Sequence, residues 1–200
     1  MNKLLEFLKN NKNDIFKPII VLLAICIVIP LALSLTNEFT SERIEKLAEE
    51  TEKETMNGLI EDAEFRAGAL DIIDVAEPFD YYTAIKDGKT VGYIFTTSAK
   101  GYGGDVSVMT AVGTDGKIIA VSILDATTET PGLGQNVTKE GFYSQYKDKT
   151  EGVAVVKNSA KDNEINAVTG ATISSKAVTA AVNDALEYYK LVVSDKGEAE

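Results

Sequence analysis

The chain has 200 residues and a formal net charge of −11, so it has room for one ordinary domain and a smaller segment. The acidic charge argues against a nucleic-acid partner, because binding to phosphates requires a basic face. Histidine is absent and Cys26 is the single cysteine, which excludes histidine-dependent catalysis, imidazole or thiolate metal sites and an intramolecular disulfide.

These exclusions bear on the kind of chemistry expected. We expect no catalytic residue and no metal ligand in this chain. Redox chemistry, if the protein performs any, would therefore require an organic cofactor.

The first predicted element is a membrane-spanning helix. Residues 18–35 read PIIVLLAICIVIPLALSL, and an uncharged run of 18 residues is long enough to cross a bilayer. A cleaved signal peptide is the main alternative, but its apolar region is only about 7–15 residues long and ends at small residues. A core helix of a soluble domain would show a polar face. We therefore predict an uncleaved anchor over residues 18–36 that contacts lipid.

The charges on either side of this run predict its orientation. Residues 1–17 carry four lysines against two acidic residues, whereas the remaining 183 residues carry 16 basic and 29 acidic residues. Positive residues stay on the cytoplasmic side of a membrane. We therefore predict a single-pass protein of the cell membrane with residues 1–17 in the cytoplasm and the acidic domain outside it.

A charged segment follows the anchor. Residues 37–66 resemble a weakly amphipathic helix with a narrow apolar stripe that includes Phe39, Ile44 and Leu47. We predict a stalk or helical lead-in over residues 37–75. A solvated helix that packs on the domain is the alternative.

The pattern changes from residue 76 onward and predicts an α+β domain over residues 76–192. It combines antiparallel strands with packed helices, and residues 193–200 are predicted to be a disordered tail. The Asp-Gly pairs at 87–88 and 115–116 are typical of hairpin turns. The expected strands are Tyr81–Ile85, Thr90–Thr97, Val106–Val112, Lys117–Leu124 and Val153–Lys157, and the expected helices are Thr138–Lys147 and Ser174–Lys190.

A cluster of hydroxyl side chains precedes the last predicted helix, in the stretch AVTGATISSKAV at residues 167–178. A helix N-terminus has unpaired N–H groups and a partial positive charge, which suit either a hydroxyl cap or a phosphate. Gly170 and Ala171 would allow a bulky ligand to approach the backbone. The residues alone leave two alternatives open: Thr172 or Ser174 caps the helix, or the cluster binds a ligand.

Three motifs resemble those of FMN-binding domains. Thr-Gly-Ala-Thr at 169–172 is similar to the flavinylation motif of that family, in which the last threonine carries FMN through a phosphoester bond. Lys-Gly-Tyr-Gly-Gly at 100–104 and Glu-Thr-Pro-Gly-Leu-Gly at 129–134 are similar to its other two signatures. The resemblance implies one covalent FMN per chain, attached to Thr172 by a flavin transferase. Thr169 and Asn166 depart from the common pattern, where serine and an acidic residue are frequent.

The resemblance also implies how the cofactor would be held. Ser174 and Ser175 would donate to its phosphate, Leu133 would form an apolar wall, and Glu129 and Thr130 would make polar contacts with the ring edge. A plain turn at 131–132 and a tight loop at 101–104 remain structural alternatives, and Tyr102 would either stack on the ring or fill the core. The full set of candidate residues is Thr172, Gly170, Ala171, Ser174, Ser175, Glu129, Thr130, Leu133, Gly134 and Tyr102.

The chain as a whole resembles the G subunits of Rnf ion-translocating electron transport complexes, and the C subunits of sodium-translocating NADH:quinone reductases share the motif. This implies an electron-carrier subunit of a ferredoxin:NAD oxidoreductase, with other membrane subunits of the complex as partners and no complete active site of its own. Two alternatives stay open: an anchored extracytoplasmic binding or scaffold module without a redox group, and a stand-alone flavinylated protein of extracellular electron transfer.

Overall fold

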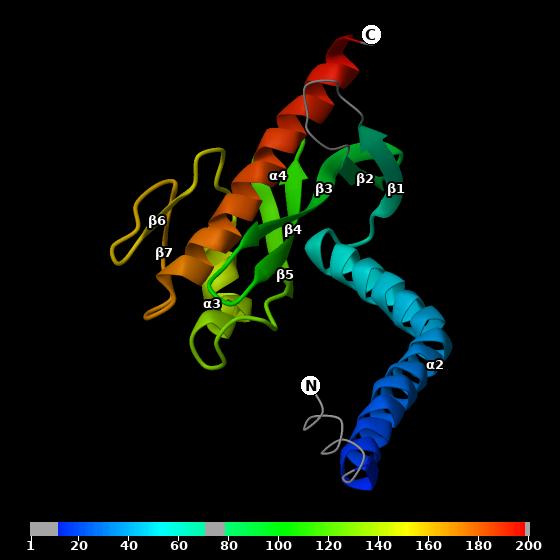
Figure 1. Ribbon diagram of the computed structural model, residues 1–200. Helices are drawn as coiled ribbons and strands as arrows, with labels where there is room; N and C mark the ends of the chain where they lie inside the picture. The colour runs from blue at the N-terminus through cyan, green and yellow to red at the C-terminus, as the bar shows by residue number, and fades with distance from the viewer. Residues whose placement is uncertain (1–11, 71–78, 199–200) are drawn as a thin grey trace. The chain divides into compact units, whose positions relative to one another are not determined.

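The computed structural model describes residues 12–70 and 79–198 (Figure 1). The chain divides into two compact units, Met1–Glu52 and Lys53–Glu200. Most of the predicted cytoplasmic segment, and the predicted boundary between residues 75 and 76, lie outside the described residues.

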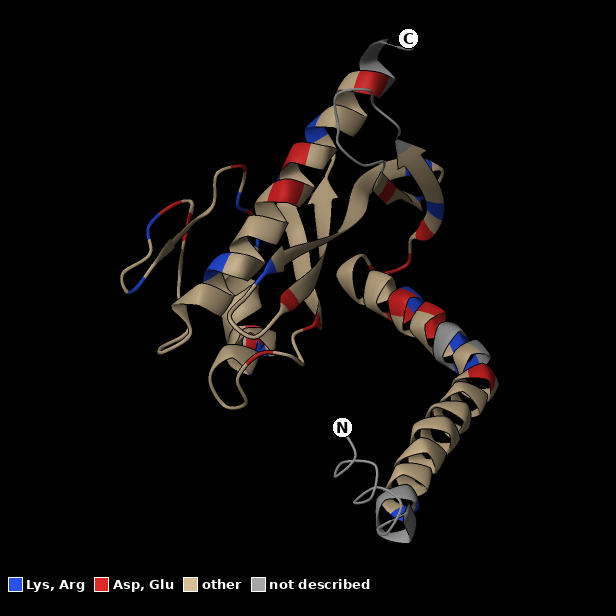
Figure 2. Ribbon diagram, in the orientation of Figure 1, with Lys and Arg blue, Asp and Glu red and all other residues tan. Residues whose placement is uncertain are grey.

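The N-terminal unit consists of most of helix α2, which runs from Lys12 to Leu59. Within it, the segment Lys17–Ser41 contains an 18-residue window with a mean hydropathy of 2.9, and none of that window is buried. Figure 2 shows most of this part of the helix free of charged residues. In the described chain this is the one helix long and apolar enough to cross a membrane, which is compatible with a single-pass anchor.

The helix predicted over residues 37–66 was wrong for its last seven residues. The predicted anchor and stalk form one continuous helix, but this helix ends at Leu59 rather than at residue 66. Asp62 reverses the chain with a φ of 58°, and strand β1 follows at Glu64–Leu70. The segment becomes a strand because it pairs along its whole length with the next strand, and the ring of Tyr81 lies over Gly68. Such pairing is a tertiary effect that overrides the local helical pattern.

The C-terminal unit contains an antiparallel sheet of five strands in sequence order. After β1 come β2 (Phe79–Lys86), β3 (Lys89–Lys100), β4 (Asp105–Gly113) and β5 (Ile118–Asp125). The β2–β3 turn has positive φ values at both Asp87 and Gly88, as a type I′ hairpin turn requires. The predicted antiparallel arrangement and the α+β class are confirmed.

Both faces of the sheet are covered. Helix α4 (Thr172–Glu198) packs on one face, where side chains at three- and four-residue spacing, among them Val178, Ala181 and Leu186, are buried against β3 and β4. The last turn of α2 covers the other face with Met56, Leu59 and Ile60. α4 also continues past residue 190, so the prediction of a disordered tail was wrong for residues 193–198.

The connection between β5 and α4 is compact and irregular. The predicted helix Thr138–Lys147 is instead a single α-helical turn, α3 (Glu140–Tyr143), between two 3₁₀ segments, η1 (Gly134–Thr138) and η2 (Ser144–Tyr146). A small parallel pair follows, β6 (Ala154–Val156) and β7 (Glu164–Asn166), of which the sequence analysis missed β7. The connection brings residues 126–134 and 167–171 to the start of α4.

Two buried threonines on the α4 side of the sheet allow a matched test of stability. The Thr110 hydroxyl is buried and has no hydrogen-bond partner in the described part of the chain, whereas the Thr97 hydroxyl donates to Ala181 O at 2.8 Å. Because an unpaired buried hydroxyl costs ~1–3 kcal/mol, we expect Thr110→Val to raise the melting temperature by about 3 °C. Thr97→Val should lower it by a similar amount. Thermal denaturation of both variants provides the measurement, and a loss of stability in Thr110→Val would contradict the prediction.

Candidate functional site

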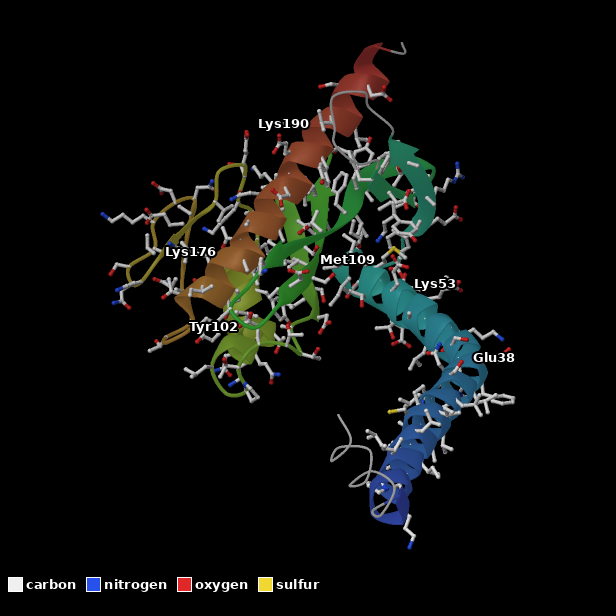
Figure 3. All side chains as sticks on the ribbon, viewed as in Figure 1. Glu38, Lys53, Tyr102, Met109, Lys176 and Lys190 are labelled. Carbon is white, nitrogen blue, oxygen red and sulfur yellow. The ribbon has the colours of Figure 1, made fainter. Side chains whose placement is uncertain are left out.

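A cleft of about 560 Å³ opens beside the first turn of α4. It brings together residues from all three sequence motifs, although these are separated by up to 70 positions in the chain. Figure 3 labels Tyr102 at the β3–β4 loop, near the start of α4. The cleft is lined by Tyr102, Glu129, Thr130, Leu133, Gly134, Gly170, Ala171, Thr172, Ile173 and Ser174. Of the predicted site residues, Ser175 is the one that does not line it.

The carboxylate of Glu129, itself in the second motif, joins the glycine-rich loop at 100–104 to the first turn of α4. Its side chain is only 1% exposed. One oxygen, Oε1, accepts hydrogen bonds from the backbone N–H groups of Tyr102 (2.7 Å) and Gly103 (3.1 Å). The other, Oε2, accepts a hydrogen bond from the Ser174 hydroxyl at 2.6 Å. The sequence analysis predicted a contact with a ligand edge for Glu129 and did not anticipate this structural role.

The glycines of the motifs allow this close approach. A Cβ atom on Gly101 would lie 2.1 Å from Glu129 Oε1, and one on Gly134 would lie 2.3 Å from Oε2. On Gly103 it would lie 1.9 Å from the backbone oxygen of Thr128. Any larger residue at these positions would displace the loop or the carboxylate, which explains why two of the motifs are rich in glycine.

A tight turn positions Thr172 at the start of α4. Ala171 N donates to Val168 O (2.9 Å), and Gly170 has a φ of 80°, as the third residue of a type II turn requires. Ala171 O accepts the first helical hydrogen bond, from Ser175 N at 3.0 Å, so Ala171 is the N-cap. Thr172 is therefore the first helical residue, and neither it nor Ser174 caps the helix.

This arrangement leaves the helix N-terminus uncapped. Alanine is a poor N-cap because it has no side-chain acceptor. The N–H groups of Thr172, Ile173 and Ser174 have no acceptor among the residues that the structure describes. Together with the helix dipole, they give this end of the cleft a partial positive charge that suits an anion such as a phosphate.

The two serines of the cluster, Ser174 and Ser175, make hydrogen bonds within the protein. The Ser174 hydroxyl donates a hydrogen bond to Glu129 Oε2. The Ser175 hydroxyl, which is fully buried, donates to Ala171 O (2.9 Å) and accepts from Val168 N (3.0 Å). Each hydroxyl has one proton to donate. In this structure both hydroxyl protons are used within the protein, where the two serines hold the Glu129 loop and the turn before α4. Donation by these serines to a phosphate stays a prediction.

The hydroxyl groups of Tyr146 and Thr179 form a second pair, which supports the start of α4. Tyr146 is fully buried, and its hydroxyl lies 2.6 Å from Thr179 Oγ1, which donates to Ser175 O at 2.9 Å. Burial raises the pKa of the Tyr146 phenol, so it stays neutral and donates to Thr179. The first two turns of α4 are thus held in place by η2.

Apolar side chains at the mouth of the cleft are unusually exposed. Tyr102 is 71%, Ile173 53% and Leu133 45% exposed. Tyr102 therefore does not fill the core, and Ile173 joins the predicted set as a residue that the sequence analysis missed. Ile173 directly follows Thr172. The sequence signal that could have identified it is an apolar side chain in an otherwise polar first turn of the helix.

The donor set and the shape fit a flavin nucleotide. Ligand sites combine apolar walls with a few polar groups in a cavity of about 300–1,000 Å³. Here three exposed apolar side chains lie close to an uncapped helix N-terminus, so a planar aromatic ring and a phosphate have complementary surfaces in one cleft. The Thr172 side chain is half-buried and lines the same cleft.

Comparison with known proteins also indicates a flavin-binding domain. Residues 101–187 match the family of FMN-binding domains. The chain belongs to the family of G subunits of ion-translocating ferredoxin:NAD(+) oxidoreductase (Rnf) complexes. It is 34% identical over 193 residues to the G subunit of the Na(+)-translocating ferredoxin:NAD(+) oxidoreductase complex of Acetobacterium woodii, an alignment that covers 88% of this chain and 92% of that protein.

Two further similarities extend this result. The G subunit of the proton-translocating ferredoxin:NAD(+) oxidoreductase complex of Clostridium ljungdahlii is 47% identical over 109 residues, which span 54% of this chain and 58% of that relative. The crystal structure of the C subunit of the Na(+)-translocating NADH-quinone reductase of Parabacteroides distasonis shares the fold. Its TM-score is 0.54 at 23% identity, with 68% of this chain and 79% of that chain covered.

Proposed function

We propose that the protein is a covalently flavinylated electron-carrier subunit of a membrane-bound, ion-translocating ferredoxin:NAD oxidoreductase complex. The observation that carries the proposal is the position of Thr172. It is the first residue of α4, half-buried, in a cleft between an uncapped helix N-terminus and exposed apolar side chains. A phosphoester at its hydroxyl would therefore hold the phosphate at the positive end of the helix.

The other cleft residues would hold the cofactor without covalent bonds. The backbone N–H groups of residues 172–174 would bind the phosphate, and Leu133, Ile173 and Tyr102 would contact the ring system. Gly170 and Ala171 leave the attachment site accessible, Thr130 offers an exposed hydroxyl at the rim, and Gly134 allows the loop to approach α4. FMN, when bound, supplies the electron transfer chemistry.

The proposal also includes the location of the protein and the enzyme that attaches its cofactor. The apolar segment of α2 would cross the cell membrane once, contacting lipid and the other subunits of the complex, with the N-terminus in the cytoplasm and the domain outside. A flavin transferase would attach the FMN. A covalent bond suits this location because a dissociated cofactor would be lost to bulk solvent.

Mass spectrometry of the protein from its native host tests the attachment. We expect the peptide that contains Thr172 to gain the mass of one FMN less one water, because the threonine oxygen forms a bond to phosphorus and water is lost. Fragmentation should place the addition on Thr172. An unmodified peptide from a host that contains the transferase would contradict the proposal and favour the binding or scaffold module. Copurification with other membrane subunits would distinguish the complex from a stand-alone flavoprotein.

A further inference from the structure

Glu129 is an unusual group for the wall of a ligand cleft. Its carboxylate is buried, and its three hydrogen bonds come from two backbone N–H groups and one hydroxyl, all of them uncharged. No lysine or arginine in the described part of the chain forms an ion pair with it. The site therefore holds a buried negative charge that is stabilised by dipoles and has no positive counter-ion among the described residues.

The same carboxylate determines the shape of the cleft. It fixes the β3–β4 loop that carries Tyr102 to the loop that carries Leu133, and it fixes both to the first turn of α4 through Ser174. These bonds are made entirely within the protein, so the cleft is assembled before any ligand arrives.

We propose that Glu129 is a positioning residue with an electrostatic role: it preassembles the cleft, and its unpaired negative charge lowers the reduction potential of the flavin held there. This inference rests on the proposed function. A fixed negative charge opposes the addition of an electron nearby, and its effect is strong where the protein excludes water. Both roles follow from one side chain, and one substitution separates them.

Glu129→Gln is the variant that separates position from charge. The glutamine oxygen can accept the two backbone hydrogen bonds as Oε1 does now. Its amide nitrogen then faces Ser174, whose hydroxyl can rotate to accept instead of donate. The variant keeps the connections between the three segments and removes the charge, whereas Glu129→Ala removes both. Glu140→Gln, an exposed position in α3, is the matched control for a lost carboxylate.

The positioning role can be tested on protein that carries no flavin. In Glu129→Ala the N–H groups of Tyr102 and Gly103 lose their acceptor, so we expect their hydrogen exchange to become about tenfold faster. In Glu129→Gln and Glu140→Gln, exchange at these two amides should stay close to that of the wild type. Unchanged exchange in Glu129→Ala would overturn the positioning role.

The electrostatic role is tested by redox titration of the flavinylated protein. We expect Glu129→Gln to shift the reduction equilibrium about tenfold toward the reduced flavin, a rise of ~59 mV for a one-electron step. Glu140→Gln should leave the potential unchanged. A Glu129→Gln potential equal to or below that of the wild type would overturn this role. Wild-type protein without covalent flavin would instead overturn the proposed function, and the exchange measurement would still decide the positioning role.

Discussion

Replacing Thr172 by alanine should abolish covalent flavin and leave the fold intact. The substitution removes the oxygen to which the phosphoester would be attached, so protein from a host with the transferase should give no fluorescent band in a denaturing gel. The Thr172 side chain is half-buried, and its hydroxyl forms no hydrogen bond with any residue that the structure describes. We therefore expect the melting temperature of the unmodified protein to change by less than about 2 °C.

Two neighbouring variants serve as controls for Thr172→Ala. Thr169→Ala removes an exposed hydroxyl in the preceding turn and leaves the attachment oxygen in place, so it should retain the flavin. Thr172→Ser keeps a hydroxyl at the attachment position and should retain at least part of the signal. A fluorescent band of normal intensity in Thr172→Ala would show that the attachment site lies elsewhere.

Gly103→Ala should cause the largest loss of stability among single-methyl additions around the cleft. The new Cβ would lie 1.9 Å from the backbone oxygen of Thr128, a distance that forces the β3–β4 loop to move. The buried carboxylate of Glu129 then loses donors. We expect a loss of about 3 kcal/mol in the free energy of unfolding and a melting temperature lower by about 9 °C. Flavin content per chain should fall as well.

Gly141→Ala is the matched control for Gly103→Ala. A Cβ atom at Gly141 would meet no other atom within 4 Å, and the residue lies in the helical turn α3, where alanine is favoured over glycine. Its melting temperature should stay the same or rise slightly. Equal melting temperatures for the two variants would contradict the steric explanation.

Part of the fold could be predicted because its signals are local. The turn residues Asp87 and Gly88 and the alternating strands predict the hairpins, and the spacing of apolar residues predicts α4. Where the signal depended on pairing across the fold, prediction failed. β1 forms because β2 lies beside it, and β7 is a strand of three residues whose partner is β6. Neither strand has a distinctive local pattern.

The sequence alone determined the apolar segment long enough to cross a membrane, the α+β class and the threonine proposed to carry the flavin, because each is encoded in a run of neighbouring residues. Only the tertiary structure decided what surrounds that threonine. Glu129 reaches partners 26, 27 and 45 positions away, which no local pattern contains. Likewise, the hydrogen bonds made by the Ser174 and Ser175 hydroxyl groups depend on how the loops meet the helix. Each hydroxyl has one proton to donate, and the acceptor that lies near it in space decides where that hydrogen bond is made.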